Sequence, residues 1–228
     1  MSGARPLPVG YRGLAELDAG LAIGATRGGR TIRAIAIGAR GPTTLVIAGV
    51  HPIEWIGVEV ARALTAALVA APPTDRRVVR DREVAVEIDA EAAAVRALVD
   101  GPDAPPIDRA VALHSFGRMI LLPWAHRGDR PPRYRELRAH ADAIAARMPE
   151  RYRVFQAGRW PPFRLGGLEL DWLTARGALT LLVECGGGGG RLGAPSTWTR
   201  PFAWYNPPDG AAQAAAIAAA IAPFARGA

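Results

Sequence analysis

Residues 43–50 constrain the fold most strongly, because they form a continuous run of β-branched and apolar side chains. Such a run is typical of a strand that is covered on both faces, as in a parallel sheet between two layers of helices. Residues 54–69 follow with helical periodicity and many alanines, and the sequence Ala-Pro-Pro at 71–73 ends that helix. The sequence therefore predicts a strand–helix unit whose strand is buried.

The alternation of strands and helices continues along the chain. Further strands are expected at residues 30–37, 84–88, 109–113, 119–123 and 178–184, and helices at 90–99, 133–147, 168–176 and 211–224. This alternation is typical of an α/β domain with a largely parallel central sheet. The chain has 228 residues and no internal repeat or long linker, so we expect a single domain over residues 1–228.

The composition excludes several kinds of active site. The net charge of +7 comes from arginine alone, since the chain has no lysine. Without lysine there is no Walker A phosphate loop, no pyridoxal phosphate Schiff base and no ordinary protein-kinase site. The single cysteine, Cys185, excludes an internal disulfide and an all-cysteine zinc cluster. The arginines are spread among acidic residues without a cluster, which does not favour nucleic-acid binding.

The sequence does not predict a membrane partner. The N-terminus lacks the basic start and apolar run of a secretory signal. The longest apolar stretches are short and interrupted by arginine, so they do not predict a membrane-spanning helix. We therefore expect a cytoplasmic protein that acts on a small molecule or a peptide, and the sequence leaves its oligomeric state open.

Ionisable side chains stand at the carboxyl ends of three expected strands. His51 and Glu54 follow the first strand, His114 follows the second, and Glu184 ends the third. Ligands bind at the carboxyl ends of strands in open α/β sheets, so we expect these residues to meet at one edge. Taken singly, each histidine is also explained by a structural role. Together, two histidines and one glutamate can hold one Zn²⁺ with a position left open, and Glu184 can act as a general base.

Four elements of the chain occur in the order found in one known family. They are His-Pro-Ile-Glu-Trp at 51–55, Leu-His-Ser-Phe-Gly at 113–117 with Pro-Trp at 123–124, Gly-Gly at 166–167 with Leu-Asp-Trp at 170–172, and Leu-Leu-Val-Glu at 181–184. The sequence resembles the zinc carboxypeptidases of the M14 type, including their succinylglutamate desuccinylase and aspartoacylase branch.

This resemblance implies a three-layer α/β/α sandwich with a largely parallel mixed sheet. It also implies that His51, Glu54 and His114 are the zinc ligands and that Glu184 is the general base.

The chain departs from the family between the second and third ligands. The stretch from Glu54 to His114 is short and contains no asparagine, so the family's Asn-Arg clamp for a terminal carboxylate is missing. The arginine that polarises the scissile carbonyl has no clear counterpart, and Arg118 is our candidate for that role. Arg164 and Arg82 are candidates to bind a carboxylate, which suits a guanidinium fork. For Arg118 and Arg164, the favoured alternative is that each is one of the many surface arginines.

Several further positions follow from the same comparison with the family. Phe163 lies roughly where the family has a tyrosine, and it lacks the hydroxyl group. Leu170 stands at a specificity position, which favours an apolar or aromatic substrate group. Asp89 is a candidate for the carboxylate that orients the first histidine ligand. We expect His126 and His140 at the surface.

These observations favour a zinc-dependent hydrolase that cleaves an amide bond. A metallocarboxypeptidase and an N-acyl-amino-acid deacylase of the aspartoacylase type are both open. Because the carboxylate clamp is missing, an inactive member of the fold that binds a peptide or an anion is the alternative.

Overall fold

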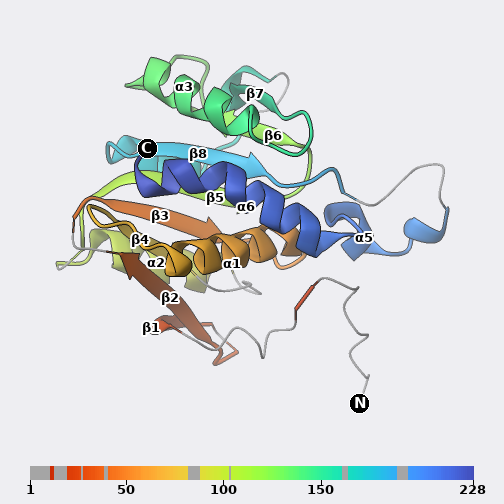
Figure 1. Ribbon diagram of the computed structural model, residues 1–228, viewed down its shortest axis with the longest axis horizontal. Coiled ribbons are helices and arrows are strands. Elements are labelled where there is room, and N and C mark those ends of the chain that lie inside the picture. The colour runs from red at the N-terminus through yellow and green to blue at the C-terminus, as the bar shows by residue number, and fades with distance from the viewer. Residues whose placement is uncertain are drawn as a thin grey trace.

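The described part of the chain folds around one mixed sheet of eight strands, as a computed structural model shows (Figure 1). The structure describes residues 11–12, 20–26, 28–38, 41–81, 88–102, 104–160, 164–188 and 195–228. The strands lie in the order β1-β2-β4-β3-β5-β8-β6-β7. They are β1 (Leu21–Ala25), β2 (Thr31–Gly38), β3 (Thr43–Ala48), β4 (Arg77–Asp81), β5 (Ile107–His114), β6 (Met119–Leu122), β7 (Arg153–Gln156) and β8 (Leu179–Glu184).

The centre of the sheet is parallel and its flanks are mixed. Strand β3 pairs in parallel with β4 and β5, and β5 pairs in parallel with β8. On the two sides, β2 runs antiparallel to β4, and β6 runs antiparallel to β8. Every residue of β3 is buried, as the apolar run at 43–50 predicts. The expected α/β fold with a largely parallel mixed sheet is therefore confirmed.

Helices cover both faces of the sheet. They are α1 (Trp55–Ala70), α2 (Ile88–Asp100), α3 (Tyr134–Ala145), α4 (Glu169–Ala175), α5 (Pro201–Tyr205) and α6 (Gly210–Arg226). Helices α1 and α6 lie side by side in front of the central strands, with α3 beside β6 and β7 (Figure 1). The other face packs against α2 and α4, through Val95 and Leu173 respectively. No described helix is long and apolar enough to cross a bilayer.

Most expected elements are present, with ends that shift by a few residues. The sequence reasoning missed β1, β4, β7 and α5. Strand β4 has only two apolar residues, Val78 and Val79, so its signal is weak. Of the strand expected at 84–88, residues 84–87 lie outside the described residues, and Ile88 begins α2 instead.

Gly57 brings helix α1 unusually close to strand β5. A Cβ atom at this position would lie 2.6 Å from the carbonyl oxygen of Leu113, which is backbone and cannot move away easily. The glycine thus lets the first turn of α1 rest on the end of β5. This close approach places Glu54, just before α1, next to His114, the last residue of β5.

Replacing Gly57 with alanine should therefore destabilise the protein, although alanine favours helix by about 1 kcal/mol. The clash with Leu113 should outweigh that gain and lower the free energy of unfolding by about 1–3 kcal/mol. Urea denaturation measures the change, and Gly166→Ala is the control because a Cβ there meets no atom within 4 Å. A Gly57→Ala variant as stable as the parent chain would contradict the account.

Candidate metal centre

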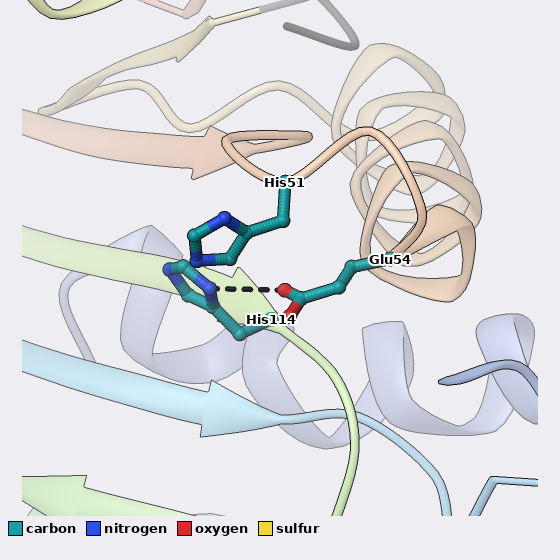
Figure 2. Close-up of side chains that lie close together, drawn as sticks. All are labelled: His51, Glu54 and His114. Atoms are coloured by element: carbon teal, nitrogen blue, oxygen red, sulfur yellow. Dashed lines mark hydrogen bonds and ion pairs between the residues drawn. The ribbon is translucent and has the colours of Figure 1, made fainter. Parts of the chain in front are cut away.

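Three strand ends meet on the face of the sheet that α4 covers. Along β5, Ala110 and Ala112 belong to the cores on this face, and the alternation of a strand puts His114 on the same side. Glu184 ends β8 directly opposite His114 in the register of the two strands. His51 and Glu54 come from the turn between β3 and α1 (Figure 2). The expected meeting at one edge is what the structure shows.

His51, Glu54 and His114 lie close enough together to bind one metal ion. A ligand atom from each lies within 4.8 Å of the other two. The Nδ1 atom of His114 lies 3.0 Å from Oε2 of Glu54 (Figure 2), and the backbone N–H of Ser115 donates to the same oxygen at 3.1 Å. Both Glu54 and His114 are buried. Two imidazoles and one carboxylate are a ligand set that suits Zn²⁺.

Asn206 fixes the turn that carries His51 and Glu54. Its Oδ1 atom accepts the backbone N–H of Ile56 at 2.7 Å, and its Nδ2 atom donates to the carbonyl of Ile53 at 2.7 Å and to that of Phe202 at 2.9 Å. The side chain is buried, so these bonds do not compete with water. The sequence reasoning missed this role. The one available signal was that Asn206 is the only asparagine of the chain.

Glu169, which sequence reasoning also missed, contacts the other nitrogen of His114. Its Oε1 atom lies 2.5 Å from Nε2, so the imidazole stands between two carboxylates. Burial alone would lower the pKa of His114, but the bonds to Glu169 and Glu54 outweigh it and raise the pKa to about 10. In the metal-free protein the ring thus holds a proton on each nitrogen. A bound metal ion would displace the one on Nδ1, while Glu169 would keep the one on Nε2, as is common around metal-binding histidines.

Glu184 is partly buried, and one of its carboxylate oxygens lacks a partner. Its Oε2 atom is fully covered, and no described residue forms a hydrogen bond with it. Burial raises the pKa of Glu184 to about 7, and the nearby Glu54 and Glu169 add to the rise while His114 opposes it. A buried acceptor of this kind is costly unless something else supplies a donor. The arrangement suits a water or a substrate group at this position.

Comparison with known proteins finds matches by structure but none by sequence. No family model and no curated protein match the sequence. Solved structures do match: carboxypeptidase A of Helicoverpa armigera aligns with a TM-score of 0.68 and 14% identity, over 91% of this chain and 68% of that one. The chain has the metallocarboxypeptidase fold.

Two other structures show the same fold. Bovine thrombin-activatable fibrinolysis inhibitor, solved with tick carboxypeptidase inhibitor, aligns with a TM-score of 0.66 and 13% identity, over 94% of this chain and 97% of that one. An aspartoacylase family protein of Mesorhizobium loti aligns with a TM-score of 0.50 and 16% identity, over 75% and 63% of the two chains. The fold implied by the M14 resemblance is therefore confirmed, whereas the shortening between the ligands stays a prediction.

Of the three predicted arginines, Arg118 has a clear partner in the structure. The Nη2 atom of Arg118 lies 2.7 Å from Oε2 of Glu150, and its guanidinium packs against Gly187. No hydrogen bond or ion pair joins Arg118 to Glu54, His114 or Glu184 among the described residues. Arg164 is exposed. Arg82 lies outside the described residues, so its predicted role stays a prediction.

The other predicted positions have mixed outcomes. Leu170 is fully buried in the core with Leu121 and Leu182, and its role in specificity stays a prediction. Phe163 lies outside the described residues, as does the side chain of Asp89. His140 is half-buried against Phe224 rather than fully at the surface.

Replacing Glu169 with alanine should weaken metal binding by about tenfold to a hundredfold, because His114 loses the carboxylate that orients its ring. Titration of the metal-free protein with Co²⁺, followed by visible absorption, measures the dissociation constant. Glu136→Ala is the control, since Glu136 is exposed and pairs with Arg133 on α3. Equal affinities in the two variants would show that Glu169 does not position His114.

The raised pKa of Glu184 predicts a pH-dependent stability of the metal-free protein. In the native state the carboxyl group of Glu184 stays protonated up to about pH 7. In the unfolded chain it loses the proton near the ordinary pKa of 4.5. The stabilisation is thus complete below about pH 4.5 and is lost as the pH rises through 7. Between pH 4.5 and pH 7, the free energy of unfolding of the parent chain should fall by roughly 2–3 kcal/mol relative to that of Glu184→Gln.

Urea denaturation at a series of pH values, with a chelator present, measures that difference. Glu150→Gln is the control because Glu150 lies at the surface. A difference between Glu184→Gln and the parent chain that does not vary with pH would contradict the burial of the Glu184 carboxyl group.

Proposed function

We propose that the chain is a zinc-dependent hydrolase that cleaves an amide bond. The observation that supports this most is the unpartnered buried oxygen of Glu184 opposite His114, at the edge where His51 and Glu54 also lie. A purely structural cluster would satisfy such an oxygen internally. A hydrolase requires an acceptor of this kind, one that no protein donor already occupies.

Each residue of the centre has a role in the proposed reaction. His51, Glu54 and His114 would hold Zn²⁺, which lowers the pKa of water and polarises a carbonyl oxygen. Glu184 accepts a proton from the attacking water and then donates it to the departing amine nitrogen, so one water is consumed and an acid and an amine are released. The place of Glu184 at the end of β8, opposite His114, suits a group that both takes and gives a proton at the reacting amide.

The substrate we propose is a small amide or a peptide, without nucleic-acid or membrane partners. Both a metallocarboxypeptidase and an N-acyl-amino-acid deacylase fit this centre, because both release an amine from an amide. The fold is shared with carboxypeptidase A and with an aspartoacylase family protein, and this likeness supports both candidates.

The proposal predicts that Glu184→Gln binds zinc as the parent chain does but loses amide hydrolysis by at least about a hundredfold. His51→Ala should instead lose stoichiometric zinc, measured by elemental analysis after dialysis. Hydrolysis is followed by amine release from a panel of N-acetyl amino acids and N-blocked dipeptides. Glu150→Gln serves as the control for both measurements.

Two results would contradict the proposal. Stoichiometric zinc in His51→Ala would overturn the ligand assignment. Binding of these amides by the zinc-loaded parent chain without any turnover would favour the inactive binding protein instead.

A further inference from the structure

The excess positive charge of the chain comes from one stretch of the sequence. Residues 118–164 contain 11 arginines and four acidic residues, whereas the rest of the chain contains 17 arginines and 17 acidic residues. The net charge of +7 therefore belongs to this stretch alone. The stretch contains β6, α3 and β7, which lie together at one end of the sheet (Figure 1).

The ion pairs within this stretch leave its excess charge uncompensated. Each of the four acidic residues pairs with one arginine, in the pairs Arg118–Glu150, Arg127–Asp129, Arg133–Glu136 and Arg138–Asp142. Seven other arginines of the stretch are exposed and form no ion pair within the ranges that the structure describes: Arg130, Arg135, Arg147, Arg151, Arg153, Arg159 and Arg164. Seven like charges at one end of a small protein favour a partner of opposite charge.

Strand β7 offers an unpaired edge at this end. It is the last strand on its side of the sheet, and no described strand pairs with its outer edge. Its inner edge pairs in parallel with β6, where the backbone N–H of Arg153 donates to the carbonyl of Arg118 at 2.9 Å. Successive peptide groups of a strand point to opposite edges, so the N–H and the carbonyl of Val154 point outward. An extended peptide can bind to such groups by strand addition.

The side chains beside this edge suit acidic residues. Arg153 and Phe155 lie on the same face of β7, and Arg151 is exposed two residues earlier. The guanidinium of Arg153 lies 5.2 Å from the ring centroid of Phe155 and 5.9 Å from that of Trp160. This stacking holds the guanidinium beside the strand, where its planar fork can bind a carboxylate. A strand added to β7 would place a side chain about 5 Å from Arg153, measured between Cβ atoms.

Charge and backbone together distinguish between possible partners. A second copy of β7 would bring the same arginines into contact, so repulsion opposes the pairing of two copies. A nucleic acid would match the charge but has no peptide groups for the strand edge. An extended protein segment with acidic side chains matches both features.

We propose that the outer edge of β7 binds an acidic, extended segment of another protein, through strand addition at Val154 and ion pairs with Arg151 and Arg153. The segment has glutamate or aspartate at every second position, because alternate residues face the same side of a strand. This binding uses neither zinc nor its proposed ligands. The inference therefore goes beyond the proposed hydrolase and holds or fails independently of amide hydrolysis.

The probe is the fluorescein-labelled peptide Thr-Glu-Thr-Glu-Thr-Glu-Thr-amide, and fluorescence anisotropy at low salt measures its binding to the parent chain. The same peptide with glutamine in place of glutamate should bind about fivefold more weakly or worse, because its ion pairs are lost. The double variant Arg151→Gln, Arg153→Gln should weaken binding of the glutamate peptide to a similar extent. The control is Arg96→Gln, Arg135→Gln, which removes the same charge from exposed sites on α2 and α3 and should change the affinity by less than about twofold.

Two N-methylated peptides test the strand addition on the parent chain. One is methylated on the N–H groups of its glutamates and the other on those of its threonines. Alternate N–H groups of an added strand face β7, so only one of the two forms should lose binding. Val154→Pro should also weaken binding about fivefold, because it removes the outward N–H while keeping the bonds to β6. Thermal unfolding checks that each variant is folded.

Three results would overturn the inference: equal binding of the glutamate and glutamine peptides, unchanged binding by Arg151→Gln, Arg153→Gln, or unchanged binding of both methylated forms. Oligouridylate is the competing probe. If it binds more tightly than the glutamate peptide and the same double variant loses it, the surface belongs to RNA and the protein partner is overturned.

Discussion

The parallel pairing of β3, β5 and β8 is the constraint on which the rest of the structure depends. Since the three strands run in the same direction, their carboxyl ends reach one edge of the sheet together. The register then sets His114 opposite Glu184, and the alternation of side chains turns both toward the face that α4 covers. A shift of β8 by one residue would send Glu184 to the opposite face.

Buried charge is the second constraint, and it follows from the first. Glu54, Glu169 and Glu184 share a small, poorly hydrated space with two imidazoles, and three carboxylates there repel one another. The structure relieves this in two ways: His114 bonds to two of the carboxylates, and Glu184 favours its protonated form. A divalent cation held by His51, Glu54 and His114 would offset the same charge, so the electrostatics and the ligand geometry agree.

Gly57 and Asn206, which shape the backbone around the candidate centre, do not line the pocket beside it. Gly57 and Asn206 act on the backbone, by allowing α1 to approach β5 and by fixing the turn after β3. The pocket beside the centre is formed by α2 and α4, which contact the sheet on the other face from α1 and α6. Glu169 of α4 belongs to both, since it lines the pocket and contacts His114.

The sequence by itself determined the α/β class, the buried strand at 43–50, and the three strand ends that carry His51, Glu54, His114 and Glu184, because periodicity and local order along the chain encode them. It did not determine the contacts of Glu169 with His114 and of Asn206 with Ile56, which join residues 55 and 150 positions apart respectively. It also pointed to Arg118, which the fold pairs with Glu150. Only the tertiary structure decides such partners, since a side chain's chemistry depends on what long-range packing places against it and on how much water that packing removes.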